Sequence, residues 1–249
     1  MLGMDRCRRI ALLNKRRGRR EQGLILLDSR PVIVEALALG LVQELFVDEE
    51  RRDVLEGMPK LTNVTLTDVR PDQLKRMADS QTSFGLVAVA KPPAEGARSL
   101  LEQPSFRGVF LDGLSDPGNV GTIARCALAF GVDFLLVGEG TVEMLAPKTL
   151  RASAGALLRL PLIGFQREEL TAISARVLRT IPKGGTPISD LEPADQTVLW
   201  LGNEARGVGE APDGSHVQDV SIALSPSVES LNVATAAAIC LHALMDSSG

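Results

Sequence analysis

Aromatic side chains are scarce in this chain of 249 residues: they make up 3% of the sequence, and tyrosine is absent. Stacking of bases on exposed rings is therefore a poor basis for any nucleic-acid binding. Only three cysteines and two histidines are present, with no CxxC pair and no metal-ligand spacing. We expect neither a disulfide framework nor a bound metal.

The chain also lacks a long apolar run. Residues 231–245 come closest, but Asn232, Thr235 and His242 interrupt them. The run falls short of the roughly 20 apolar residues that span a bilayer. The N-terminus has neither the apolar region nor the small-residue cleavage site of a secretory signal. We expect a cytoplasmic protein without a membrane anchor.

Charge is distributed unevenly along the chain, although the formal net charge is only −4. Residues 1–95 carry 16 basic and 14 acidic side chains, whereas residues 96–249 carry 11 and 17. Eight basic residues and one acid fall within residues 1–20. Such a cluster is typical of a phosphate-contacting arm, because each basic group docked on a phosphate releases a counterion. A solvated, frayed terminus is an equally good interpretation.

Short apolar runs alternate with amphipathic stretches and predict an α/β fold. In the first part of the chain we expect strands at residues 24–27, 44–47, 64–66 and 85–90, and helices at 31–41 and 71–78. Residues 1–92 are interpreted as a small α/β domain that begins with the basic arm of residues 1–20. Residues 93–106, enriched in proline and glycine, are interpreted as a linker.

Residues 107–249 are interpreted as a second domain with a mostly parallel sheet. Strands are expected at 108–114, 132–138, 160–165, 177–181, 197–202 and 220–224, and helices at 122–131, 147–158, 167–175 and 229–245. Parallel sheets of this kind bind ligands at the carboxyl ends of their strands. The special loops of this domain all fall at such ends.

Three loops could carry chemistry. In residues 115–133, glycines allow a tight turn, Asn119 can cap the next helix, and Arg125 follows on that helix. A dinucleotide-binding turn with Glu139 on the ribose is an alternative, but it requires GxGxxG where this chain has GNVG. Residues 202–209 (GNEARGVG) and 225–238 follow two further strands, with Glu229 or Ser230 as the expected helix cap. No loop carries an activated nucleophile, so we expect a binding site for a reactive small molecule.

The segments NVGTIARCALAFGV, LGNEARGVG and SLNVATAAA, in this order and spacing, resemble the three motifs of the SpoU (TrmH-like) branch of SPOUT methyltransferases. PKTLRASAGALLRLP resembles the family as well. The resemblance implies S-adenosylmethionine-dependent methylation of ribose 2'-hydroxyls in RNA. It also implies a homodimer formed by the C-terminal domain, a deep trefoil knot in that domain, and an N-terminal substrate-binding domain similar to ribosomal protein L30e.

The resemblance assigns site residues position by position. The catalytic positions are Arg125, Asn119, Glu204, Ser230 and Asn232, and the cofactor-binding positions are Thr180, Gly202, Asn203, Glu204, Ile222 and Leu231. For RNA binding we expect the basic residues Arg16, Arg17, Arg19, Arg20 and Arg30. Two departures from the family pattern are Asp28-Ser29 ahead of Arg30, and Ser225-Pro226-Ser227 in the loop before SLN.

A guanidinium is hardly ever deprotonated in a protein, so we expect Arg125 to orient the hydroxyl and stabilise its developing charge, not to act as a base. Ribosomal RNA is the expected substrate by analogy alone. Transfer RNA is an alternative, as is a catalytically silent RNA-binding protein with the same fold. A nicotinamide-dependent oxidoreductase is a more distant alternative.

Overall fold

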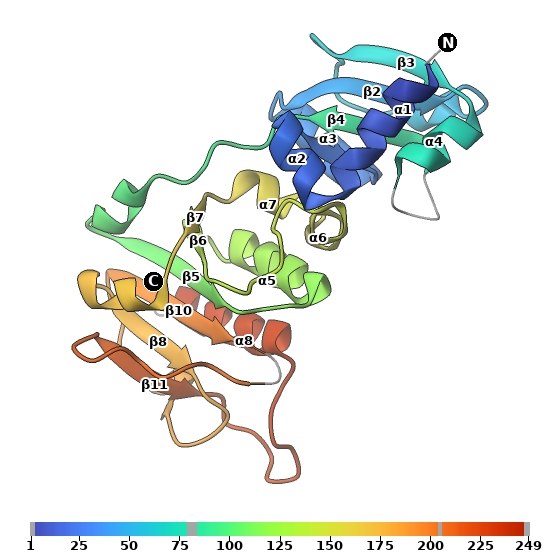
Figure 1. The fold of residues 1–249 in the computed structure, drawn as a ribbon. Helices are drawn as coiled ribbons and strands as arrows, with labels where there is room; N and C mark the ends of the chain where they lie inside the picture. Colours follow the sequence, from blue (N-terminus) through green and yellow to red (C-terminus); the bar gives the residue numbers. More distant parts are fainter. Residues whose placement is uncertain (1–2, 79–83, 204–205, 247–249) are drawn as a thin grey trace. The chain divides into compact units, whose positions relative to one another are not determined.

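The computed structural model describes residues 3–78, 84–203 and 206–246 and confirms the α/β fold (Figure 1). The chain divides into two compact units. Unit 1 comprises Met1–Pro93 and Glu143–Arg159, and unit 2 comprises Ala94–Val142 and Leu160–Gly249. The sequence pattern groups residues 143–159 with the second domain, whereas in the structure they pack within unit 1.

Unit 1 is built on a four-stranded sheet in the order β1-β4-β2-β3. Its strands are β1 (Ile25–Leu27), β2 (Val42–Asp48), β3 (Thr65–Val69) and β4 (Leu86–Ala90), and its helices from this part of the chain include α3 (Arg30–Ala38) and α4 (Pro71–Met77). Strand β4 pairs antiparallel with β1 and β2, whereas β2 and β3 are parallel. All six elements expected between residues 23 and 90 are present near their expected positions.

The basic N-terminus is folded, so the interpretation of residues 1–20 as a frayed terminus is wrong, whereas phosphate contact by this segment stays a prediction. It forms α1 (Met4–Ala11), a short 3-10 helix (Leu12–Asn14) and α2 (Arg16–Gln22). Cys7, Ile10 and Leu13 recur every three residues and are buried in the core of unit 1. Asn14 also donates a hydrogen bond of 2.9 Å to the carbonyl oxygen of Met77. These apolar positions, not the charges, decide the local structure.

The segment Glu143–Arg159 forms two short helices where one was expected. Helix α6 (Pro147–Ser153) is separated from α7 (Ala156–Arg159) by Ala154 and Gly155, which have φ angles of +49° and +93°. Left-handed backbone of this kind ends a helix. At Gly155 a side chain would also be obstructed, since a Cβ atom there would lie 2.9 Å from the Cβ of Glu35.

Three ion pairs hold this segment within unit 1. They join Arg19 to Glu143, Arg151 to Asp28, and Arg159 to Glu35. The Asp28 side chain is almost completely buried, so its pairing with Arg151 compensates a carboxylate that would otherwise be costly to desolvate.

Unit 2 contains a seven-stranded sheet in the order β7-β6-β5-β10-β8-β11-β9, and every pairing in it is parallel. Its strands are β5 (Phe106–Asp112), β6 (Phe134–Val137), β7 (Leu162–Gly164), β8 (Arg176–Thr180), β9 (Thr186–Pro187), β10 (Gln196–Gly202) and β11 (Val217–Ser221). The expected mostly parallel sheet is confirmed. Strand β9 was not expected, and β11 ends before Ile222 instead of extending to Leu224.

The helices of unit 2 begin at other residues than expected. Helix α5 (Pro117–Ala129) is capped by Asp116, whose carboxylate accepts from the Asn119 N–H at 3.1 Å, so Asn119 is not the cap. Helix α8 (Val233–Asp246) begins after Asn232, whose side-chain oxygen accepts from the Ala234 N–H at 2.9 Å. This corrects the expected cap at Glu229 or Ser230.

Other connections in unit 2 are 3-10 helices, at Arg98–Glu102 within the expected linker, at Arg167–Ala172 and at Ile188–Asp190. Several aromatic residues lie in the core of this unit, and Trp200 and Phe110 are fully buried with their ring centroids 5.7 Å apart. Helices α5 and α8 pack against each other (Figure 1). Within the residues that the structure describes, every helix is too short or too polar to cross a membrane.

Candidate functional site

A cavity of about 760 Å³ opens at the carboxyl ends of β8, β10 and β11 in unit 2. Loops that leave these strands form its walls, and the start of α8 closes one side. Its lining residues are Thr180, Ile181, Pro182, Gly202, Asn203, Arg206, Gly207, Val208, Val220, Ser221, Ile222, Leu224, Ser230, Leu231, Asn232, Val233, Ala236 and Cys240. We call it the strand-end cavity. Its location is the one at which open parallel sheets bind ligands.

Most of the cofactor-binding and catalytic residues expected from the sequence line the strand-end cavity. Five of the six proposed cofactor-binding residues line it, namely Thr180, Gly202, Asn203, Ile222 and Leu231, and so do the proposed catalytic residues Ser230 and Asn232. Glu204, proposed for both roles, lies outside the described residues. Residues as distant in sequence as Thr180 and Asn232 therefore line the same cavity.

The loop after β10 turns back on itself beside the cavity. The Gly207 N–H donates to the Asn203 carbonyl oxygen at 2.8 Å, and the Arg206 N–H donates to the Asn203 side-chain oxygen at 3.1 Å. Asn203 also donates from its side chain to the Gly113 carbonyl oxygen at 2.7 Å. A Cβ atom on Gly202 would lie 2.5 Å from the Gly207 carbonyl oxygen, so only glycine permits this turn.

Arg179 and Asp219 hold the far end of the same loop. They face each other across β8 and β11, with nitrogen–oxygen distances of 2.6 and 2.9 Å, and Arg179 also donates to the Gly209 carbonyl oxygen at 3.0 Å. The hydrogen bonds from Arg179 lower the pKa of Asp219, and those to Asp219 raise the pKa of Arg179. Neither residue was expected from the sequence, although a charge within an apolar strand is a usable signal.

A second missed pair lies at the end of β5. Arg167 donates to one carboxylate oxygen of Asp112 at 2.8 Å, and the Trp200 indole N–H donates to the same oxygen at 3.0 Å. The Arg167 guanidinium carbon lies 5.7 Å from the centre of the Trp200 ring. This network fixes the carboxyl end of β5 beside β10.

The remaining catalytic candidates lie on and beside α5. Asn119 accepts a hydrogen bond of 3.0 Å from the Asn232 side chain, which links the first and third loops. Arg125 follows six residues later, about 9 Å along the helix axis. Its side chain is exposed, does not line the strand-end cavity, and makes no hydrogen bond or ion pair with any described residue.

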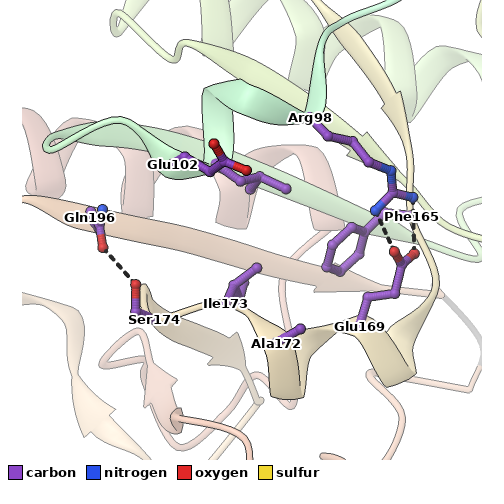
Figure 2. A pocket seen from close by; sticks show the side chains of 9 residues that line it. Arg98, Glu102, Phe165, Glu169, Ala172, Ile173, Ser174 and Gln196 are labelled. Atoms are coloured by element: carbon purple, nitrogen blue, oxygen red, sulfur yellow. Dashed lines mark hydrogen bonds and ion pairs between the residues drawn. The ribbon is translucent and has the colours of Figure 1, made fainter.

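Figure 2 shows a second, smaller cavity of about 360 Å³ in unit 2, which we call the paired cavity. Arg98 and Glu169 form an ion pair at its edge, and Arg98 also donates to the Gly164 carbonyl oxygen at 3.0 Å. The hydrogen bond from Arg98 lowers the pKa of Glu169. Ser174 donates to Gln196 at 3.2 Å on the other side. None of the residues proposed from the sequence lines this cavity.

The proposed RNA-binding residues of unit 1 differ in their surroundings. Arg19 is buried and donates to Glu143 at 3.0 Å and to the Leu13 carbonyl oxygen at 2.6 Å, so its expected phosphate contact is wrong. Arg17 is exposed but pairs with Glu21 at 2.6 Å. Arg30 is exposed and donates to the Glu56 carbonyl oxygen.

Within residues 15–22, three basic side chains are exposed and have no described ion-pair partner. They are Lys15, Arg16 and Arg20, which we call the α2 cluster. In the described part of the chain, no three His, Cys, Asp or Glu side chains gather as a group that could hold a metal ion.

Comparison with known proteins points to one family. The model of the SpoU rRNA Methylase family matches residues 107–242. Among curated relatives, the 23S rRNA (guanosine(2553)-2'-O)-methyltransferase RlmP of Bacillus subtilis (strain 168) is 29% identical over 239 residues. The match covers 93% of this chain and 92% of that protein.

Two solved structures share the fold over almost the whole chain. A TrmH-family protein from Porphyromonas gingivalis is 26% identical with a TM-score of 0.83, and the match covers 98% of each chain. The SpoU methyltransferase AviRb from Streptomyces viridochromogenes, in complex with the cofactor AdoMet, is 26% identical with a TM-score of 0.80. That match covers 98% of this chain and 97% of the other.

Proposed function

This chain belongs to the SpoU rRNA Methylase family, and from that premise we propose that it transfers a methyl group from S-adenosylmethionine to a ribose 2'-hydroxyl of RNA. One observation carries the proposal: residues from three separate loops, chosen from the sequence for cofactor binding, line a single cavity at the carboxyl end of a parallel sheet. The AdoMet complex of AviRb supports the choice of cofactor.

The strand-end cavity fits S-adenosylmethionine in size and lining. Its volume of about 760 Å³ is in the usual range for small-molecule sites. Val208, Ile222 and Leu231 offer apolar surface to an adenine ring, and the tight turn at Gly202 allows backbone groups to approach a ligand. When bound, the cofactor would supply an electrophilic methyl group, so the protein needs no nucleophile of its own.

Cys240 lines the cavity and could compete with the ribose for the methyl group if it were a thiolate. Burial raises the pKa of its thiol to about 12, so it stays protonated and unreactive at neutral pH. The apolar surroundings that hold the adenine thus also protect the protein from self-methylation.

Arg125, Asn119 and Asn232 are the groups we assign to the ribose. Arg125 remains charged, so it orients the 2'-hydroxyl through an adjacent RNA phosphate and stabilises the charge that develops on the attacking oxygen. The Asn232–Asn119 hydrogen bond fixes two amides between the cavity and α5, where they restrict the position of the ribose. Ser230 contributes a hydroxyl at the cavity wall.

Ribosomal RNA is the proposed substrate class. Support comes from the relative RlmP, which is named for 23S rRNA, and from the α2 cluster of unit 1, which offers unpaired cations to a phosphate backbone. We place the enzyme in the cytoplasm on the same ground. An L30e-like role for the N-terminal residues and a trefoil knot in the C-terminal residues remain predictions of the resemblance.

We also propose a homodimer formed through unit 2. Leu128 on α5 and Ile239 on α8 are 40% and 39% exposed, although the two helices pack against each other. Exposed apolar side chains on packed helices favour an interface. Light scattering should give twice the chain mass, and Leu128→Glu should shift the molecule towards the monomer.

The function is tested by incubating the protein with radiolabelled S-adenosylmethionine and either ribosomal or transfer RNA. Methyl-group incorporation into ribosomal RNA, mapped to a ribose 2'-oxygen, is expected. Incorporation only into transfer RNA would move the assignment to that substrate. RNA binding without cofactor binding by calorimetry would overturn the enzymatic proposal in favour of a silent RNA-binding protein.

A further inference from the structure

Arg206 is the one charged side chain among the described residues that line the strand-end cavity. Its other polar side chains, Thr180, Asn203, Ser221, Ser230 and Asn232, are neutral. The family motifs used to choose site residues did not single out Arg206. Its backbone is fixed, because its N–H donates to Asn203 and the next residue, Gly207, pairs with the Asn203 carbonyl oxygen.

The Arg206 guanidinium has no protein partner in the described structure. It makes no ion pair or side-chain hydrogen bond there, in contrast to Arg98, Arg167 and Arg179 of the same unit, each of which is paired with a carboxylate. A guanidinium presents several donors in a rigid fork that matches a carboxylate or a phosphate. An unpaired guanidinium at the wall of a ligand cavity is therefore available to an anionic group of the ligand.

We propose that Arg206 binds the methionyl carboxylate of the cofactor, an inference that rests on the proposed function. S-adenosylmethionine carries two positive groups, the sulfonium and the ammonium, and one negative group, the carboxylate. Since Arg206 repels the first two and attracts the third, it fixes the direction in which the methionyl chain lies. In doing so it directs the sulfonium methyl group away from its own charge.

The chemistry predicts a specific pattern of ligand preference. S-adenosylhomocysteine keeps the carboxylate, whereas 5'-methylthioadenosine keeps the adenosine and a thioether but has no amino-acid portion. Removing the guanidinium should therefore lower the affinity for S-adenosylhomocysteine and leave the affinity for 5'-methylthioadenosine unchanged. A general distortion of the loop would weaken both.

Titration calorimetry without RNA tests this inference on the full chain, with Arg206→Gln, Arg206→Lys and the control Arg98→Gln. We expect Arg206→Gln to lower the affinity for S-adenosylhomocysteine about 10- to 100-fold, the range for a lost hydrogen bond to a charged group. Binding of 5'-methylthioadenosine should change less than about twofold, and lysine should restore part of the lost affinity. The Arg98→Gln control should match the unmodified protein for both ligands.

Three other outcomes would overturn the inference. If Arg206→Gln leaves S-adenosylhomocysteine binding unchanged but weakens RNA binding, the anion is an RNA phosphate. Equal weakening of both adenosine ligands would make Arg206 a determinant of loop shape alone. If the unmodified protein binds neither ligand, the proposed function itself fails, and this outcome is distinguishable because it appears before any substitution.

Discussion

The two cavities of unit 2 each contain one arginine at their edge, and they differ in what that arginine does. In the paired cavity, Arg98 is neutralised by Glu169, so its guanidinium is not available to an anionic ligand. In the strand-end cavity, Arg206 has no described carboxylate partner. The two cavities therefore differ in whether their arginine is available to an anionic group.

Among the unpaired arginines, Arg125 is expected to affect activity most when it is replaced. Replacing it with alanine or lysine should lower kcat about 100- to 1000-fold, the usual loss when a donor to a developing oxyanion is removed. Lysine cannot reproduce the guanidinium fork. Steady-state kinetics with ribosomal RNA measure the loss.

The Arg125 variants also have an internal control. Because Arg125 is exposed and does not line the strand-end cavity, their unfolding temperature and affinity for S-adenosylhomocysteine should equal those of the unmodified protein. Near-normal turnover of Arg125→Lys would break the comparison, since a point charge would then be sufficient.

Among the carboxylates that pair with an arginine, Asp112 is expected to affect stability most when it is replaced. Asp112→Ala leaves the buried Trp200 N–H without its acceptor and removes the carboxylate from Arg167. The free energy of unfolding should fall by about 1–3 kcal/mol, the cost of an unsatisfied buried donor. Urea denaturation measures it, and a loss of activity with no loss of stability would show that this pair belongs to the site instead.

The α2 cluster extends the comparison to unit 1. Changing Lys15, Arg16 and Arg20 together to glutamine should lower RNA affinity about 10-fold and reduce its dependence on salt, because fewer counterions are released. Arg17→Gln is the matched control, since Arg17 already pairs with Glu21. Equal losses in both proteins, measured by filter binding across a salt titration, would contradict the distinction between paired and unpaired cations.

Asp219 should give the smallest effect, and its sign depends on pH. Arg179 lowers the folded-state pKa of Asp219 below its unfolded value of about 3.9, so the ion pair stabilises the protein above that pH. Asp219→Asn should therefore be less stable than the unmodified protein at pH 6, and the difference should vanish as the pH falls through the lowered pKa. Its size should stay below about 1 kcal/mol, because the carboxylate is 36% exposed.

A matched measurement separates this charge effect from packing. Thermal unfolding of both proteins between pH 2 and pH 7 gives the difference directly. If Asp219→Asn were equally destabilising at every pH, the hydrogen-bond geometry and not the charge of the pair would hold the loop at Gly209.

Apolar periodicity was sufficient to predict the strands of both sheets other than β9. It failed at the N-terminus, where nine of the first 20 residues are charged, and only the packing of Cys7, Ile10 and Leu13 within the core of unit 1 reveals the helices. It also failed at Ala154, because apolar periodicity carries no signal for a left-handed backbone at an alanine. Strand β9, only two residues long, has too little pattern to detect.

The candidate site was predictable where motif residues lie in loops after strands. Thr180, Asn203 and Leu231 line one cavity as their sequence positions suggested. The prediction that Arg19 contacts RNA was wrong because a run of arginines gives no sign of which one is buried. Its partner Glu143 lies 124 residues away in the sequence. Arg206 was not predicted from the sequence, because the sequence does not show which arginines are paired with a carboxylate. Only the three-dimensional neighbours of Arg206 reveal that it has no described partner.

The discontinuity of unit 1 sets a practical limit on exchanging its parts. A fragment that ends at Pro93 would omit Glu143, Arg151 and Arg159, which pair with Arg19, Asp28 and Glu35. Asp28, 2% exposed, would then carry a buried charge without compensation. Any graft of unit 1 onto another protein must therefore bring residues 143–159 with it, although they lie between the two sequence segments of unit 2.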